Sequence, residues 1–242
     1  MDTAVISAGG KGGRLYPLTN IIPKPLMPIS GKPTIEWILE MLNKHNFKRV
    51  FITLGYKADE IKNYLGKSYK GVSITYLTES EPLGTAGAFN LFSSKIKETF
   101  LQIHADILID VNLAEVLAKH QKEKNFVTLV VKTIDDPSPF SSVVIKNNRV
   151  RDYVFKPKKE DAPSQVVFTG VSILEPLVFS LVREKKIADF DKDILMPLVH
   201  EEKIGAYLYT GPWFPIDTIE KYACANAFWR TPFSAHTSSF EI

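Results

Sequence analysis

The sequence predicts a single-domain α/β fold with a mostly parallel (mixed) sheet and helices on both of its faces. In the first half, apolar runs alternate with amphipathic stretches. These runs are apolar throughout, as in strands covered on both faces. No segment rich in Gly, Ser or Pro interrupts the 242 residues. We therefore expect one continuous domain over residues 1–231 and a tail over 232–242.

Four apolar runs predict the strands of the first half, over residues 4–8, 50–54, 72–77 and 100–104. The stretches between and after them predict helices over 34–42, 59–65, 86–92 and 113–122. The helix over 34–42, for example, is predicted because the spacing of Ile35, Ile38 and Leu42 places them on one helical face. Gly55 and Gly66 stand where the second strand and the second helix are expected to end.

The second half has a different pattern, with more strands and fewer helices. Strands are predicted over residues 127–131, 142–145, 150–155, 166–174 and 204–209. Residues 146–149 suit the turn of a hairpin, and the polar stretch 158–164 is expected to be a loop. Helices are predicted over 178–185 and 219–229. The sheet should therefore be mixed rather than purely parallel.

Composition excludes several classes of protein. Thirty Lys and Arg against 27 Asp and Glu give a net charge of +3, too small to predict nucleic-acid or membrane binding. The single cysteine, Cys224, forbids an intrachain disulfide and fits a reducing compartment. Neither a leader peptide nor a membrane-spanning run is evident. We expect a soluble cytoplasmic protein with no nucleic-acid or membrane partner, and leave a homo-oligomer open.

A glycine-rich loop follows the first predicted strand directly. It contains Gly9, Gly10, Gly12 and Gly13 and ends at Arg14. Glycines free a backbone to adopt positive φ and to approach phosphate closely, and arginine adds a fork of phosphate donors. The loop lacks the Gly-Lys-Ser/Thr end of a P-loop, and no helix is expected directly after it, as a dinucleotide fold requires. Taken alone, it equally fits a glycine-rich loop without a ligand.

The continuation resembles one enzyme family. Leu15-Tyr16-Pro17-Leu18-Thr19 precedes Pro23-Lys24-Pro25 and then Gly31-Lys32-Pro33. Residues 7–33 are thus similar to the signature of the sugar-1-phosphate nucleotidylyltransferases, most closely of mannose-1-phosphate guanylyltransferase-like domains. The resemblance implies a Rossmann-like catalytic domain over 1–231, without the β-helix of longer members. Gly13 replaces the family threonine, so a hydroxyl able to touch phosphate is lost.

The family reaction joins a sugar-1-phosphate to the α-phosphorus of a nucleoside triphosphate and releases pyrophosphate. The attacking oxygen is already anionic, so cations and positioning carry the catalysis. The resemblance assigns this role to Arg14, Lys24 and Lys156, with Mg²⁺ as cofactor. It also suggests Asp106 and Asp217 as metal ligands, although Pro215 occupies the usual second aspartate position. Asp217 suits equally the N-cap of the last helix.

The nucleotide side is expected to involve small residues of two loops. By resemblance they are Ala8, Gly9, Gly10, Gly12, Gly13, Glu81 and Gly84. The stretch Leu83 to Ala88 is most like that of guanylyltransferases, which favours GTP with a mannose-1-phosphate-like acceptor. A cytidylyl-, thymidylyl- or uridylyltransferase remains the alternative.

The acceptor side departs from the family. By resemblance it comprises Ser142, Phe155, Phe168 and Gly170, but a glutamate and an asparagine of the family are phenylalanines here. Phenylalanine cannot pair with sugar hydroxyls. The residues therefore suggest either a non-standard acceptor phosphate or a catalytically weak regulatory homologue that binds nucleotide sugars.

Three further expectations concern single polar residues. His104 is expected beside Asp106, where it could touch a ligand. Asp110 is expected to cap the helix that begins near residue 113. The remaining histidines are expected on the surface; they are His45, His120, His200 and His236.

Overall fold

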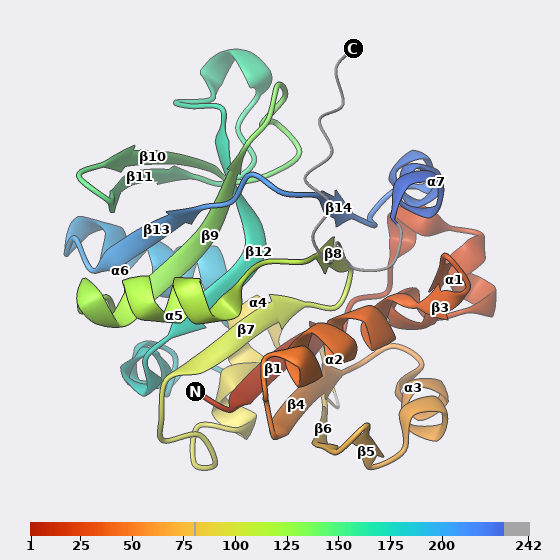
Figure 1. The fold of residues 1–242 in the computed structure, drawn as a ribbon. Helices are drawn as coiled ribbons and strands as arrows, with labels where there is room; N and C mark the ends of the chain where they lie inside the picture. Colours follow the sequence, from red (N-terminus) through yellow and green to blue (C-terminus); the bar gives the residue numbers. More distant parts are fainter. Residues whose placement is uncertain (80, 230–242) are drawn as a thin grey trace.

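The computed structural model describes residues 1–79 and 81–229, so the expected tail 232–242 lies outside the described residues, as does His236. A ten-stranded mixed sheet forms the centre of the molecule (Figure 1). Its order is β10-β11-β13-β9-β12-β7-β1-β4-β6-β5. The strands span Thr3–Ala8 (β1), Arg49–Leu54 (β4), Ser68–Tyr69 (β5), Val72–Thr78 (β6), Phe100–His104 (β7), Val127–Thr133 (β9), Ser142–Lys146 (β10), Arg149–Val154 (β11), Val166–Leu174 (β12) and Ile204–Leu208 (β13).

The parallel part of the sheet is built by the first half of the chain. Strands β7, β1, β4 and β6 are parallel neighbours. Beyond β7 the pairing changes, because β12 runs antiparallel to both β7 and β9, and β10 and β11 form the expected hairpin. Tight turns join antiparallel strands, whereas parallel neighbours need crossover connections. The predicted mixed α/β fold is confirmed, with the parallel pairs concentrated in the first half.

Helices cover both faces of the sheet. Within β1, Ala4 and Ile6 pack on one face and Val5 on the other, as strand geometry requires. The first face carries α2 (Thr34–Lys44), α3 (Ala58–Leu65) and α5 (Leu113–Lys122). The second carries α4 (Gly84–Gly87), the 3₁₀ helices η3 (Ala88–Leu91) and η5 (Pro176–Leu181), the π-helix η6 (Phe190–Leu195) and α6 (Met196–His200).

Short elements complete the structure. Two small ladders pair β2 (Pro28–Ile29) with β3 (Lys32–Pro33) and β8 (Ile107–Ile109) with β14 (Trp213–Pro215). The remaining helices are η1 (Gly13–Leu15), α1 (Leu18–Ile21), η2 (Lys24–Leu26), η4 (Lys159–Asp161) and α7 (Ile219–Phe228). None of the helices in the described ranges has the length and hydropathy needed to cross a membrane.

The helices of the structure differ from the predicted ones in two places after residue 175. The helix expected over residues 178–185 is a 3₁₀ helix that begins at Pro176 and ends at Leu181. Proline at a first helical position sets this earlier start. The π-helix η6 and helix α6 were not predicted, since the polar residues Asp189, Asp191 and Asp193 obscure the helical spacing of their few apolar neighbours.

Two expectations about single residues are wrong. His120 is 1% exposed, because it lies on the face of α5 that packs on the sheet. Its Nδ1 lies 2.9 Å from Oγ1 of Thr128 in β9. Asn112 caps α5 in place of Asp110, and its Oδ1 accepts from Ala114 N at 3.2 Å. The Asp110 carboxylate lies instead 3.5 Å from Lys44 Nζ.

Candidate active site

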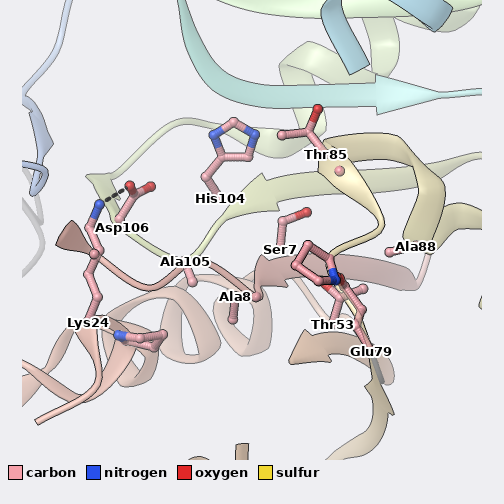
Figure 2. Close-up of a pocket in the computed structure, with 16 residues that line it drawn as sticks. Ser7, Ala8, Lys24, Thr53, Glu79, Thr85, Ala88, His104, Ala105 and Asp106 are labelled. Atoms are coloured by element: carbon pink, nitrogen blue, oxygen red, sulfur yellow. Dashed lines mark hydrogen bonds and ion pairs between the residues drawn. The ribbon is translucent and has the colours of Figure 1, made fainter. Parts of the chain in front are cut away.

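A cavity of about 340 Å³ opens where the parallel strands end (Figure 2). Ser7 and Ala8 at the end of β1, Thr53 of β4 and His104 of β7 line it. Open α/β sheets bind ligands at this carboxyl edge, where loops rather than strands surround the space. Gly9, Gly10, Gly12 and Gly84, which the sequence predicted for the nucleotide side, line the same cavity.

A second cavity of about 240 Å³ adjoins the first. Thr85, His104 and Asp106 line both cavities, so the two spaces meet at these side chains. Among the predicted site residues, the second cavity is lined by Arg14, Asp217, Phe155, Lys156, Phe168 and Gly170. The arrangement provides two neighbouring compartments with Asp106 between them.

Of the four loop glycines, only Gly12 adopts a positive φ, at 67°. A Cβ built on Gly12 would lie 2.8 Å from Thr19 Cγ2 and 3.5 Å from Lys24 Cβ, so a side chain there would displace its neighbours. Of the two uses expected of these glycines, the left-handed turn is therefore made by Gly12 alone. Gly10 has open space around it, and Gly13 lines neither cavity. Gly9 and Gly10 leave open space in the first cavity, whereas the left-handed turn of the loop is made by Gly12.

Lys24 and Asp106 form an ion pair between Nζ and Oδ2 at the junction of the cavities (Figure 2). Lys24 begins η2 between two prolines, and Asp106 follows β7. Burial alone would raise the pKa of Asp106, but Lys24 and the nearby His104 hold that pKa below its ordinary value. The carboxylate is thus kept charged at the point where the two compartments meet.

A second ion pair joins Arg14 to Asp217. Arg14 Nη2 lies 2.9 Å from Asp217 Oδ2, and Lys221 Nζ lies 2.8 Å from Oδ1 of the same carboxylate. Asp217 is buried, whereas the Arg14 side chain is 59% exposed. Thr218 caps α7, with Oγ1 accepting from Lys221 N at 3.3 Å, so the N-cap alternative for Asp217 is wrong. Asp217 instead lines the second cavity.

The donor set fits a magnesium ion that arrives with phosphate. In the described part of the chain, no group of three or more His, Cys, Asp or Glu side chains is placed to hold a metal. Asp106 and Asp217 nevertheless line the same cavity. Mg²⁺ is commonly bound by one or two carboxylates together with substrate phosphate oxygens and water, so two carboxylates suffice.

Glu79 was missed by the sequence reasoning, which named Glu81. Glu81 lines neither cavity, and its Oε1 lies 2.7 Å from Lys186 Nζ. Glu79 lines the first cavity and accepts a hydrogen bond from Leu83 N at 3.2 Å. Burial raises the pKa of Glu79, while the Leu83 amide partly opposes that shift. Its place directly after β6, beside the carboxyl edge, was the available signal.

Of the two neighbouring serines on the acceptor side, the structure places Ser141 in the second cavity and not the predicted Ser142. Ser142 is fully buried, with Oγ donating to Ser164 O at 2.7 Å, and it lines neither cavity. Ser141 lines the second cavity instead. Side chains along an extended segment alternate in direction, so a shift of one residue exchanges the two serines. Asp189 and Asp191, at the start of the unpredicted π-helix, also line this cavity.

Gly170 lies in a β-bulge of β12, where the register with β9 shifts between Phe168 and Val171. Its φ is 86°, and a Cβ built there would lie 2.2 Å from Ile107 Cδ1 and 3.0 Å from His104 Nδ1. Bulges re-aim side chains beside active sites. The glycine therefore allows the strand to pass close to His104 at the junction of the two cavities.

Comparisons with known proteins agree with this geometry. Residues 3–231 match the family model described as nucleotidyl transferase, and the chain belongs to that family. The resemblance found in residues 7–33 to sugar-1-phosphate nucleotidylyltransferases is thereby confirmed.

Among its relatives is D-glycero-alpha-D-manno-heptose 1-phosphate guanylyltransferase of Aneurinibacillus thermoaerophilus, 30% identical over 92% of this chain and 96% of the relative. The UTP–glucose-1-phosphate uridylyltransferase of Synechocystis is 32% identical over 81% of this chain, which matches only 55% of that relative's length. In fold, the chain is similar to HddC from Yersinia pseudotuberculosis, with a TM-score of 0.80, 25% identity and coverage of 94% and 99% of the two chains.

Proposed function

We propose that the protein transfers a nucleotidyl group from a nucleoside triphosphate to a sugar-1-phosphate or related phosphate and releases pyrophosphate. The observation that carries the proposal is the pair of adjoining cavities that meet at Asp106, with Lys24 bound to it. One compartment has the glycine loop suited to a nucleotide, and the other contains Lys156, which suits an acceptor phosphate.

In this reaction an acceptor phosphate oxygen forms a bond to the α-phosphorus, and the bond from that phosphorus to the bridging oxygen of the leaving pyrophosphate breaks. No proton transfer is needed, because both the attacking and the departing oxygens are anionic. Lys24 stands at the junction and would bind the α-phosphate and the incoming phosphate. Arg14 would bind the leaving pyrophosphate, and Lys156 the acceptor phosphate. Fixed cations of this kind stabilise charge developing on phosphoryl oxygens.

Asp106 and Asp217 are the residues that would hold Mg²⁺, which neutralises phosphate charge when bound. In the structure each carboxylate is paired with a cation of the same site, Lys24 or Arg14. These ion pairs keep the cations close to the cavities before substrate arrives. If Lys24 and Arg14 turn to the entering phosphates, Asp106 and Oδ2 of Asp217 would be free to hold the metal, while Lys221 stays on Oδ1 of Asp217.

Pyrophosphate release tests the proposed function. The common nucleoside triphosphates would be crossed with a panel of sugar-1-phosphates, with Mg²⁺ or with excess EDTA. We expect release with at least one pair, abolished by EDTA and by Asp106→Ala, since the carboxylate stands between the two compartments. Silence across the panel, with nucleotide binding still detected by calorimetry, would instead support a regulatory nucleotide-sugar-binding protein.

GTP is the proposed nucleotide, and Glu79 supports that choice. A carboxylate only accepts hydrogen bonds, and the Watson–Crick edge of guanine offers two adjacent donors, N1–H and the N2 amino group. Uracil and thymine offer one donor, N3–H, flanked by acceptors, which suits an amide better. Glu79 is the carboxylate of the first cavity that lies on the side away from Asp106 (Figure 2).

Glu79→Gln is therefore expected to change the preferred base. An amide would present N–H to a guanine donor and lose one of two charge-assisted bonds, so kcat/KM for GTP should fall by roughly 30-fold relative to that for UTP. The measurement is kcat/KM for both triphosphates with one acceptor. Glu81→Gln, just outside the cavity, is the matched control and should leave the ratio unchanged. An unchanged ratio in Glu79→Gln would show that this carboxylate does not contact the base.

A further inference from the structure

Two carboxylates of the second cavity have no cation of their own. Asp189 and Asp191 both line it, and within the described residues neither forms an ion pair. The other two aspartates of this cavity, Asp106 and Asp217, are each paired with a cation. The wall formed by η6 is therefore negatively charged, while the phosphate-binding cations lie elsewhere in the cavity.

The position of the Asp191 carboxylate is fixed by neighbouring side chains. Its Oδ1 accepts a hydrogen bond from the Tyr153 hydroxyl and another from Ser141 Oγ at 3.2 Å. No hydrogen bond within the described residues reaches Oδ2. Burial raises the pKa of Asp191, and the neighbouring Asp189 raises it further. A group that donates a hydrogen bond to Oδ2 would stabilise the charged carboxylate and so oppose both upward shifts of the Asp191 pKa.

Packing holds this part of the π-helix in place. The ring of Phe190, next to Asp191, stacks on Phe168 with centroids 6.2 Å apart and meets Phe89 edge-on at 6.0 Å. Asp189 serves partly as a cap, since its Oδ1 accepts from Lys192 N at 3.0 Å. In the described part of the chain the Asp191 side chain caps no helix, so its carboxylate is the member of the pair available for a ligand.

Aromatic rings form another part of this surface. Phe168 and Phe155 line the cavity, and Phe155 is 46% exposed. The ammonium of Lys156 lies 5.1 Å from the Phe155 ring centroid, so this ring already offers a face to a cation. Aromatic ring faces attract an ammonium group, and a neighbouring carboxylate adds an opposite charge. They do not pair with the several hydroxyls of a neutral sugar.

We propose, building on the proposed function, that the acceptor phosphate carries an ammonium group, which Asp191 binds through Oδ2. Its phosphate lies against Lys156, and its ammonium lies against Asp191 in the cavity that the phenylalanine rings also line. Asp189 adds negative charge to the same wall. An aminated sugar-1-phosphate and an aminoalkyl phosphate share this chemistry, and the experiment separates them.

The test compares acceptors that differ only in their amine. Glucose-1-phosphate would be compared with its 2-, 4- and 6-amino-deoxy derivatives and with N-acetylglucosamine-1-phosphate, and aminoethyl phosphate with hydroxyethyl phosphate. We expect at least one amino acceptor to exceed its neutral match by tenfold or more in kcat/KM, and N-acetylation to remove the advantage. Whichever series shows the effect identifies the source. Neutral acceptors equal or superior in every pair would overturn the proposal.

Variants connect the preference to Asp191. In Asp191→Asn, the amine-to-neutral ratio of kcat/KM should fall by about tenfold or more, to near 1, because one partner of a close charge pair is removed. Asp189→Asn should lower the ratio less, and it carries the test if Asp191→Asn does not fold. Asp135→Asn, an exposed aspartate outside the cavity, is the control. A ratio that survives both cavity substitutions would refute the assignment.

Measuring transfer by pyrophosphate release and binding by calorimetry separates this inference from the proposed function. Transfer to neutral acceptors alone would support the proposed function and refute the ammonium site. Tighter binding of amino phosphates than of their neutral matches, without pyrophosphate release from any triphosphate, would support the ammonium site and refute the proposed transfer.

Discussion

Lys24→Met is expected to reduce nucleotidyl transfer by roughly 10³-fold, the loss found when one preorganised stabilising group is removed. Lys24 Nζ is paired with Asp106 at the junction of the two cavities, so no other described cation holds that place. Methionine keeps most of the length of the side chain and removes only its charge. The measurement is kcat for pyrophosphate release at saturating triphosphate and acceptor.

The control for this prediction is Lys44→Met. Lys44 also pairs with an aspartate, Asp110, at 3.5 Å, but it lines neither of the two cavities. The same chemical change should leave kcat within about twofold, because exposed ion pairs contribute about 1 kcal/mol or less. Comparable losses in the two variants would mean that Lys24 has no special role in transfer.

Gly170→Ala is expected to destabilise the protein by about 3 kcal/mol. A left-handed φ costs a non-glycine residue roughly 1–2 kcal/mol, and overpacking a tight site costs typically 1–3 kcal/mol more. Both apply here, since φ is 86° and the added Cβ would lie 2.2 Å from Ile107 Cδ1. Urea denaturation measures the loss as a lower midpoint at an unchanged slope.

Gly31→Ala separates the two contributions. Gly31 has a similar φ of 79°, but a Cβ there meets nothing within 4 Å among the residues that the structure describes. It should therefore show the backbone cost alone, roughly 1–2 kcal/mol. If the two variants lose equal stability, the close approach between β12 and the segment of His104 and Ile107 does not constrain residue 170.

Local patterns in the sequence were sufficient for much of the fold. The strands that begin at Thr3, Arg49, Val72 and Phe100 follow from uninterrupted apolar runs, and helix α2 from the spacing of its apolar residues. Each of these signals lies within about ten consecutive residues. The resemblance in residues 7–33 then indicated the family, and it drew attention to Lys24 and Asp106, which the structure brings together from 82 residues apart.

Neighbouring residues were harder to distinguish. Glu79 rather than Glu81 lines the first cavity, and Ser141 rather than Ser142 lines the second. In each case both candidates have the same chemistry, and the direction of the side chain decides between them. That direction depends on where a strand ends and how the following loop turns, which a count along the sequence fixes only to within one or two residues.

The sequence by itself determined the α/β class, the glycine loop and the charged residues proposed for phosphate chemistry, because these depend on residue type and local periodicity. Only the tertiary structure decided which charges are paired. Arg14 with Asp217, Lys24 with Asp106, and Asp191 with Tyr153 each join distant segments. Such contacts follow from the order and register of ten strands, so no local window contains them. For the same reason, the uncompensated charge of Asp189 and Asp191 became visible only once every neighbouring segment was in place.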